Sequence, residues 1–221
     1  MKPAVAIFVK TPKFSPVKTR LAATLGATDT LKFYALACAA TAAVVRECPY
    51  LTPYWAVAEA APEARTAWSG FAHTWQGEGG LGARLDHVYA ELQARHGRVL
   101  LIGADAPQLT STLLESAVVA LEDATRPFVL GPAADGGFWL FGGRQPIPQS
   151  AWTAVCYSQA DTTAQLRSAL GTSGSITTLP TLSDADVEAD LPALAESLAA
   201  LSNPLPEQRK LAAWLQTVLD R

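Results

Sequence analysis

Short apolar runs with β-branched residues alternate with helix-like segments along this chain, and this alternation constrains the fold more than any other feature. The first run, Ala4–Val9, is apolar throughout, which is typical of a strand that helices cover on both faces. Further strands are expected at 54–58, 71–75, 99–102, 128–130, 138–141 and 176–179. Strands that alternate with helices predict a three-layer α/β fold with a mostly parallel sheet.

The expected helices lie between these strands and at the end of the chain. One helix is capped by Thr28 or Asp29 and runs to about Glu47, and another is capped by Thr110 or Ser111 and runs to about Asp123. The others cover 83–96, 161–170, 187–201 and 206–219. A turn, not a helix, separates the runs at 128–130 and 138–141, so we expect an antiparallel pair there. We therefore expect a single domain over residues 1–221, with a helical C-terminal extension from about residue 187.

Composition excludes several classes of protein. Hydrophobic residues make up 49% of the chain and charged residues 17%, which supplies a packed core and argues against disorder. The net charge is −3 and no Lys/Arg-rich tract is present, so neither a nucleic-acid partner nor a membrane partner is expected. Cys38, Cys48 and Cys156 form no C-x-x-C pair, and their odd number suits a reduced, cytoplasmic protein.

Two acidic loops follow apolar runs: Gly103–Pro107, which contains Asp105, and Gly131–Gly137, which contains Asp135. In an open α/β sheet, the loops beyond the carboxyl ends of the strands form the ligand crevice. Mg²⁺ prefers one or two carboxylates together with substrate phosphate oxygens. Each loop also has a purely structural explanation, since Asp105 could cap a turn and Asp-Gly is a common hairpin signature.

Cationic residues gather near the start of the chain, with Lys10 after the first strand and Lys18 and Arg20 further on. The residue before Lys18 is Val17, where a P-loop needs glycine, and no G-x-G-x-x-G follows the first strand, so both nucleotide motifs are disfavoured. The cations either clamp phosphates or are ordinary solvated charges. The glycine-rich segment 76–82 either binds a flat ligand at a helix N-terminus or is a surface loop.

Taken in order, these segments resemble a bacterial family of GT-A-fold proteins labelled DUF2064, or "radical-SAM/selenodomain-associated transferase 1", of the nucleotide-diphospho-sugar transferase superfamily. Residues 76–85 resemble its Q-x-x-G-D-L-G-x-R-M block, 102–107 its I-G-[ST]-D-C-P block and 131–140 its G-P-A-x-D-G-G-Y-Y-L block. The opening segments 8–12, 17–21 and 25–26 and the late segment 184–191 resemble the family as well. The chain departs from the family pattern at Pro16, Gly80, Ala106, Val187 and at Tyr157-Ser158-Gln159, where W-S-T is usual.

The resemblance implies a GT-A domain that binds a nucleotide or nucleotide-sugar and a small acceptor. It implies Mg²⁺ or Mn²⁺ held by Asp105 with Asp184 or Asp186, and an acceptor side formed by Asp135, Gly136 and Gly137. Lys18, Arg20 and Asp135 would have catalytic roles. The nucleotide would be bound by Lys10, Lys18, Thr19, Arg20, Gln76, Gly79, Leu81 and Gly82.

The resemblance leaves the reaction open. The G-x-D-x-P loop, where glycosyltransferases carry D-x-D, and the small size favour nucleotidyl transfer. The alternatives are a glycosyltransferase that uses an NDP-sugar donor, and a non-catalytic nucleotide-binding or partner protein with the same fold.

Overall fold

The structure, a computed structural model, describes residues 1–171 and 174–221. Within these residues a seven-stranded sheet has the order β3-β2-β1-β4-β6-β5-β7. The strands are β1 Ala4–Val9, β2 Thr52–Val57, β3 Ala72–Trp75, β4 Val99–Ile102, β5 Phe128–Pro132, β6 Phe138–Gly143 and β7 Ile176–Thr178. Strand β6 is antiparallel to both of its neighbours, and the remaining pairings are parallel.

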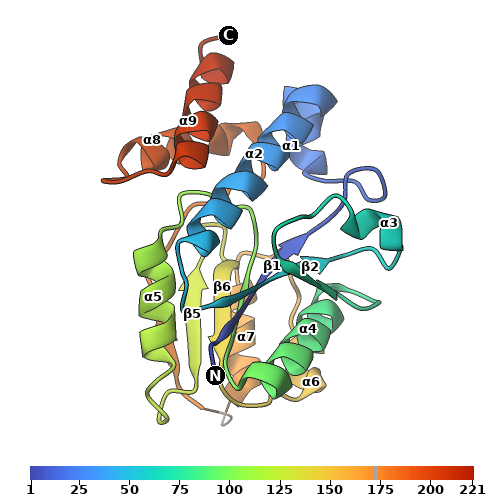
Figure 1. Ribbon diagram of the computed structural model, residues 1–221, viewed down its shortest axis with the longest axis vertical. Helices are drawn as coiled ribbons and strands as arrows, with labels where there is room; N and C mark the ends of the chain where they lie inside the picture. Colours follow the sequence, from blue (N-terminus) through green and yellow to red (C-terminus); the bar gives the residue numbers. More distant parts are fainter. Residues whose placement is uncertain (172–173) are drawn as a thin grey trace.

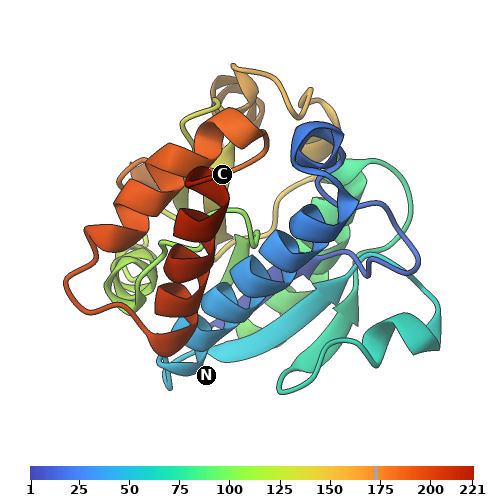
Figure 2. The same ribbon diagram turned by 90° about the horizontal axis from the view of Figure 1, so that it is seen from above.

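Helices cover both faces of this sheet (Figures 1 and 2). They are α1 Thr19–Leu25, α2 Ala27–Arg46, α3 Pro62–Arg65, α4 Leu81–His96, α5 Ser111–Ala120, α6 Gln149–Thr153, α7 Thr162–Leu170, α8 Leu191–Ala199 and α9 Pro206–Leu219, with a 3₁₀ turn at Glu188–Asp190 before α8. None of the helices within residues 1–171 and 174–221 combines the length and the apolar character needed to cross a bilayer.

The period of two along β1 divides the core into two layers. Val5, Ile7 and Val9 pack with residues of α2 and α5 on one face of the sheet. Ala4 and Ala6 pack on the other face with residues of α4, α6 and α7. Because side chains of successive strand residues point to opposite faces, a strand that is apolar throughout requires helices on both sides. The expected three-layer α/β fold is confirmed.

The two C-terminal helices form a third cluster away from the sheet. Leu191, Leu194 and Leu198 of α8 and Leu211, Trp214, Leu215 and Val218 of α9 pack against α2 and against Leu21 of α1. Figure 1 shows α8 and α9 beside α2 at one end of the molecule. This packing explains why α1 forms although the sequence gives no signal for it: Leu21 is fully buried in a cluster whose other members come mostly from α8 and α9, which are remote in the chain.

Most expected elements are present, with shifted ends. The first long helix begins at Ala27 with Gly26, instead of Thr28 or Asp29, at its N-cap, because Gly26 takes a positive φ of 85° that separates α1 from α2. The helix expected from residue 187 begins at Leu191, after the 3₁₀ turn. Thr110 caps α5 as expected, its Oγ1 accepting from the Leu113 N–H at 3.2 Å. The short helices α3 and α6 were not expected, and the antiparallel pair β5–β6 is confirmed.

The strand directions bring the loops of interest to one edge of the sheet. Strands β1, β3, β4, β5 and β7 all point the same way, so the segments that follow their carboxyl ends meet there. The antiparallel β6 begins at this edge, which places the turn between β5 and β6 there as well.

Candidate functional site

A cavity of about 570 Å³ opens at the carboxyl edge of the sheet. Its walls come from the segments that follow β1, β3, β4, β5 and β7, together with the first turn of α4 and the region before α7. It is lined by polar and charged residues that include Lys10, Lys18, Thr19, Arg20, Gln76, Asp105, Asp135, Asp184 and Asp186, and by the rings of Tyr34, Phe138, Trp139 and Tyr157. The cavity is therefore large enough for a nucleotide-sized ligand, since ligand pockets span roughly 300–1,000 Å³.

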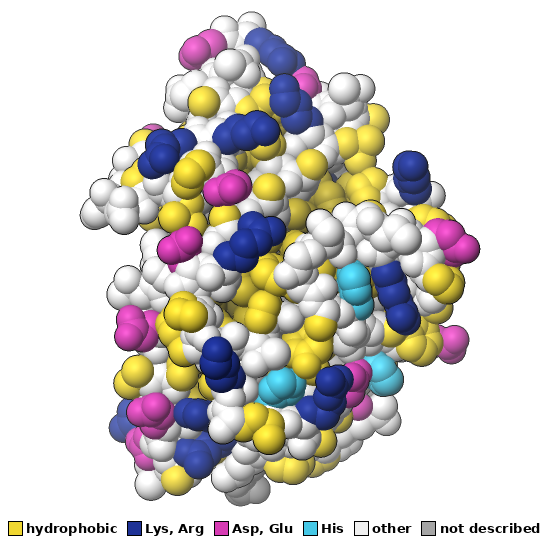
Figure 3. All heavy atoms as spheres, in the orientation of Figure 1, with side chains coloured by type: hydrophobic (Ala, Val, Ile, Leu, Met, Phe, Trp, Pro, Cys, Tyr) yellow, Lys and Arg dark blue, Asp and Glu magenta, His cyan; other side chains and the backbone are white. Residues whose placement is uncertain are grey.

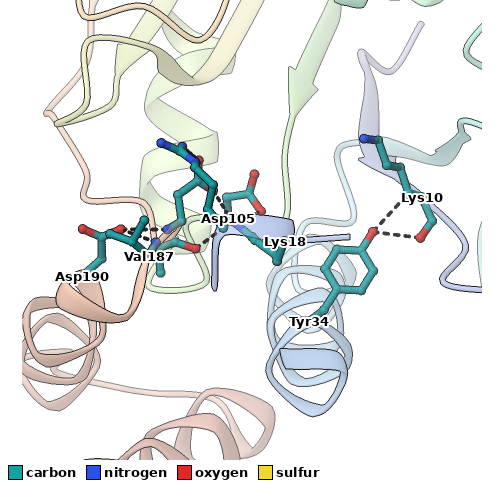
Figure 4. A network of polar contacts seen from close by, with 9 residues as sticks. Lys10, Lys18, Tyr34, Asp105, Val187 and Asp190 are labelled. Atoms are coloured by element: carbon teal, nitrogen blue, oxygen red, sulfur yellow. Dashed lines mark hydrogen bonds and ion pairs between the residues drawn. The ribbon is translucent and has the colours of Figure 1, made fainter. Parts of the chain in front are cut away.

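Lys18 lies at the centre of a charged cluster in this cavity. Its Nζ is 2.8 Å from an oxygen of Asp105 and 2.7 Å from Oδ1 of Asp186, and it donates to the Ala185 carbonyl at 2.7 Å. Arg20 pairs with the second oxygen of Asp186. Figure 4 shows Lys18 beside Asp105, with the segment of Asp190 on one side and Lys10 on the other. Three segments that are remote in the sequence thus meet at one ammonium group.

The mutual attraction in this cluster keeps Lys18 and Asp186 ionised. Burial by itself lowers the pKa of Lys18, but the negative charges of Asp105 and Asp186 outweigh it and raise the pKa above its ordinary value. Burial raises the pKa of Asp186, but Lys18 and Arg20 outweigh it and the net pKa is lowered. The Lys18 side chain is only 7% exposed, whereas that of Arg20 is 64% exposed. Arg20 therefore remains available to a ligand at the mouth of the cavity.

The backbone at Lys18 is strained. Its φ of 46° and ψ of 47° are left-handed, although Lys18 has a side chain. This conformation costs a non-glycine residue about 1–3 kcal/mol and persists only where the surroundings fix it. Lys18 stands at the N-cap of α1, where its carbonyl accepts from the Ala22 N–H at 2.9 Å. The ion pairs and the start of α1 together hold Lys18 in this geometry.

Asp184 experiences the opposite electrostatic environment. Burial, followed by the negative charges of Asp135 and Asp186, raises the pKa of Asp184 to about 6. The segment that bears it is fixed against β5: the Leu182 N–H donates to the Pro132 carbonyl at 3.1 Å, and the Ala134 N–H donates to the Leu182 carbonyl at 2.9 Å. Asp184 and Asp135 are therefore held as a mutually repelling carboxyl pair, which a cation would stabilise.

Asp135 has both a structural and a cavity-lining position. Its Oδ1 accepts from the Gly137 N–H at 2.8 Å, which is the hydrogen bond of an Asx turn. Its side chain also lines the cavity that contains Asp105. The turn role and a ligand role are thus compatible, since a carboxylate has further acceptor capacity.

The segment before α8 is fixed by its own acidic residue. The carboxylate of Asp190 accepts from the backbone N–H groups of Asp186 and Val187, each at 2.8 Å. Figure 4 shows Asp190 and Val187 next to the Lys18 cluster. Asp190 therefore holds the backbone of Asp186 in place for its ion pairs.

The end of β1 is fixed by a tyrosine that the sequence analysis did not identify. The Tyr34 hydroxyl accepts from the Lys10 N–H at 2.9 Å and donates to the Lys10 carbonyl at 3.0 Å. One side chain from α2 thus satisfies both backbone groups of the residue that follows the strand (Figure 4). The 24-residue separation in sequence gave no signal for this pairing.

Gln76 is oriented by the ends of two strands. Its Nε2 donates to the Val9 carbonyl at 3.1 Å and to the Ala56 carbonyl at 2.8 Å. Because both amide hydrogens are used, the amide oxygen is the group left for another donor, and Arg84 approaches it at 3.4 Å. Gln76 is 4% exposed and lines the cavity.

Three of the glycines expected in the site lie away from the cavity lining. Gly79 has a φ of 90°, and a Cβ on it would come within 3.3 Å of Ala83. A Cβ on Gly82 would lie 2.5 Å from the Trp152 carbonyl oxygen, so Gly82 lets α4 approach α6. Gly136 packs against Ala160, while Gly137 and Leu81 do line the cavity.

Aromatic residues on the β6 side of the cavity are a further feature that the residue-by-residue analysis did not assign. Trp139 donates from Nε1 to the Pro180 carbonyl at 3.0 Å, and the Tyr157 hydroxyl donates to the Trp152 carbonyl at 3.0 Å. Their polar atoms are therefore used within the protein. The signal available for Tyr157 was its place at the W-S-T position of the family pattern.

The carboxylates of the cavity suit a hard divalent cation. Across the described parts of the chain, no three His, Cys, Asp or Glu side chains form a ready-made metal-binding group. Mg²⁺ is usually held by one or two carboxylates plus substrate phosphates instead of an all-protein cage. Asp105 and Asp186 already share one cation, the Lys18 ammonium, so their oxygens fit this kind of site.

Comparison with solved structures identifies the fold. A protein from Desulfovibrio desulfuricans G20, provisionally described as a nucleotide-diphospho-sugar transferase, has 23% sequence identity and a TM-score of 0.81 over 98% of this chain and 97% of that one. A cytidylyltransferase from Leptospira borgpetersenii serovar Hardjo-bovis has 13% identity and a TM-score of 0.56 over 100% and 96%. The mannosyltransferase PcManGT from Pyrobaculum calidifontis, in complex with GDP-Man and Mn²⁺, has 14% identity and a TM-score of 0.50 over 99% and 70%.

The class defined by this architecture is the GT-A fold of nucleotidyl- and sugar-transferases. Within that class, the chain belongs to the family described as "Uncharacterized protein conserved in bacteria (DUF2064)", which it matches over residues 38–159. A comparison with curated proteins gives no significant match.

Proposed function

We propose that this protein is a metal-dependent nucleotidyltransferase that joins a nucleotide to a small phosphate or alcohol acceptor. The observation that carries the proposal is the meeting of Lys18, Arg20, Asp105 and Asp186 in one cavity of about 570 Å³. A nucleoside triphosphate presents several negative charges that need cations, and a metal that bridges them needs carboxylates. The cavity offers both within a few ångströms.

The proposed roles follow from position. Lys10, Lys18, Thr19 and Arg20 surround the triphosphate, while Gln76 and Leu81, with Gly79 and Gly82 behind them, face the base. Lys18 and Arg20 neutralise charge on the phosphates as the bond to the leaving group breaks. The catalytic contribution is then positioning and electrostatic stabilisation, with little covalent work by the protein.

The metal would be Mg²⁺ or Mn²⁺, held by Asp105 together with Asp184 or Asp186. When bound, it would polarise the phosphate oxygens as a Lewis acid. Asp135, with Gly136 and Gly137 in its turn, would orient the acceptor on the β6 side of the cavity. The fit of Asp105 is supported by its anchored position, since its neighbours Ala104 and Ala106 are 3% and 8% exposed.

Glycosyl transfer is the second candidate function, and one observation favours it. Phe138, Trp139 and Tyr157 line the side of the cavity near Asp135. Flat ring faces whose polar atoms are already used suit the apolar face of a sugar. A non-catalytic nucleotide-binding or partner protein with the same fold is the third candidate.

Thermal-shift measurements, followed by a turnover assay with each stabilising ligand, separate the three candidates. The protein is heated with a panel of nucleoside triphosphates and NDP-sugars, each with and without Mg²⁺ or Mn²⁺. Metal-dependent stabilisation by a triphosphate supports nucleotidyl transfer, and stabilisation by an NDP-sugar supports glycosyl transfer. Stabilisation by a nucleotide without turnover supports a non-catalytic nucleotide-binding protein. No shift with any ligand contradicts both transferase functions and supports a partner protein with the same fold.

The variant Asp105→Asn tests the metal ligand. It keeps the shape of the side chain and removes its charge, so folding is expected to change little. Calorimetry should show that nucleotide binding no longer depends on Mg²⁺. Glu122→Gln, an exposed carboxylate beyond α5, is the matched control and should retain the dependence. Equal Mg²⁺ dependence in Asp105→Asn and wild type would contradict the metal role.

A further inference from the structure

The Lys18 ammonium occupies the place between two carboxylates that a divalent cation would need. Its Nζ lies 2.8 Å from Asp105 and 2.7 Å from Asp186, and the side chain is 7% exposed (Figure 4). The same Nζ cannot contact a ligand phosphate closely while both carboxylates and the Ala185 carbonyl surround it. In this arrangement the lysine serves as the cation of the site.

A bare metal ion would therefore have to compete with Lys18. An ammonium and a divalent cation placed between the same carboxylates repel each other strongly at short range. A metal–nucleotide complex removes this conflict, because its phosphates offer Lys18 new anionic partners. A lysine can make the exchange, since its charge is carried on a flexible four-carbon chain.

The surroundings of the cluster allow the exchange. The Asp105 side chain is 50% exposed, so its oxygens can be reached from the cavity. Asp186 keeps Arg20 as a second partner and has its backbone fixed by Asp190. The backbone of Lys18 is fixed at the start of α1, so the movement required is that of its side chain alone.

We propose that Lys18 is an internal counter-cation, which holds the metal position of the nucleotide-free protein and moves to the phosphates when metal and nucleotide enter together. The proposal rests on the proposed function and specifies its regulation: metal alone binds weakly, and metal with nucleotide binds strongly. Lys18 thereby couples the two ligands, and the protein does not sequester free divalent cations.

The test measures Mn²⁺ binding in the absence of nucleotide, by titration calorimetry. In Lys18→Met the two carboxylates lose their built-in cation, and Mn²⁺ alone is expected to bind roughly tenfold more tightly than to wild type. The matched control is Lys13→Met, which removes the same charge from an exposed residue of the same loop. It should bind Mn²⁺ like wild type. Equal or weaker Mn²⁺ binding by Lys18→Met, or no measurable binding by any variant, would overturn the proposal.

A measurement on wild type keeps the proposal testable if Lys18→Met fails to fold. Acetylation of lysine amines is followed by mass spectrometry, with Lys13 as the internal standard. Lys18 should react slowly in metal-free protein and faster at saturating Mn²⁺, because displacement exposes its amine. A rate unchanged by Mn²⁺ would refute the displacement. Neither measurement uses a nucleotide, so a failure here is distinct from a failure of nucleotide binding in the thermal-shift panel.

Discussion

Gly136 packs directly against the backbone of Ala160: a Cβ on Gly136 would lie 1.9 Å from the Ala160 carbonyl oxygen. The next residues continue this contact, since the Thr163 N–H donates to the Gly136 carbonyl at 2.9 Å. The turn that bears Asp135 is thus attached to the N-terminus of α7. Gly136 also has a φ of 91°, a backbone conformation that favours glycine. Both the backbone conformation and the close contact with Ala160 therefore require a residue without a side chain.

The substitution Gly136→Ala should therefore destabilise the protein. Backbone strain and the forced displacement of Ala160 together are expected to lower the free energy of unfolding by about 2–4 kcal/mol. Urea denaturation followed by circular dichroism measures the change. Gly80→Ala is the control, because Gly80 has a φ of −73° and a Cβ there meets open space, so a change within about 1 kcal/mol is expected. Equal stability of both variants would contradict the close packing at Gly136.

Removal of Arg20 should weaken nucleotide binding while leaving the fold intact. Arg20 is 64% exposed, and its partner Asp186 retains Lys18. The loss of a charge-assisted hydrogen bond to a phosphate is expected to cost about 1.5–3 kcal/mol of binding free energy in Arg20→Ala. Calorimetric titration with the nucleotide identified by thermal shift measures it. The control is Arg126→Ala, at the opposite edge of the sheet before β5, which should bind the nucleotide like wild type. Unchanged nucleotide affinity in Arg20→Ala would show that Arg20 is a solvated surface charge that does not contact the ligand.

Stability should depend on pH through Asp184. The pKa of this carboxyl is about 6 in the folded protein and about 3.9 when unfolded, so the folded state holds the proton more tightly. The free energy of unfolding should fall as pH rises from about 4 to 6 and keep this loss above pH 6. For a half-buried group screened by solvent, the loss is about 1 kcal/mol.

The variant Asp184→Asn isolates this effect. Urea unfolding in the presence of a chelator should show that the variant lacks this fall, so its stability relative to wild type increases from pH 4 to pH 7. Asp220→Asn, an exposed residue near the C-terminus, should follow the wild-type pH dependence. If Asp184→Asn has the same pH dependence as wild type, the repulsion between Asp184 and its acidic neighbours is negligible.

Gln208 connects the C-terminal helices to the loop that bears Asp105. Its Nε2 donates to the carbonyls of Pro107 and Leu109, each at 2.9 Å, and its Oε1 accepts from the Leu205 N–H at 3.0 Å. Gln208→Leu leaves these buried groups unpaired and should cost about 1–3 kcal/mol in the free energy of unfolding. Chemical denaturation measures this loss of stability, and the control is Gln216→Leu, the same change at an exposed position of α9. Equal effects of the two changes would show that the buried hydrogen bonds add nothing.

The sheet was largely predictable from the sequence because its signal is local. Apolar runs mark the central strands β1, β4, β5 and β6, and strand direction alone brings Asp105 and Lys10 to one edge. The ion pair between Lys18 and Asp186 spans 168 residues and follows no local pattern. The left-handed backbone at Lys18 was equally inaccessible, since lysine has no preference for that conformation and remote contacts enforce it.

The distribution of charged residues over the surface does not by itself locate the candidate site. Figure 3 shows acidic and basic side chains interspersed over the face that it displays. The charged residues that do indicate the site are the buried ones, and Lys18 is the clearest example. Burial is a tertiary property, so the phosphate-clamp and solvated-charge interpretations of the cations could not be separated from spacing alone.

The packing of α8 and α9 against α1 and α2 determines which fragments of this chain can fold on their own. The family match ends at residue 159, and a fragment cut there would retain Lys18, Asp105 and Asp135 in its sequence. It would lack β7, the segment of Asp186 and the helices that cover Leu21, Phe33 and Leu36. Such a fragment would expose an apolar surface and release the loop of Asp105. We therefore expect the smallest autonomously folding unit to be longer than the recognisable family signature.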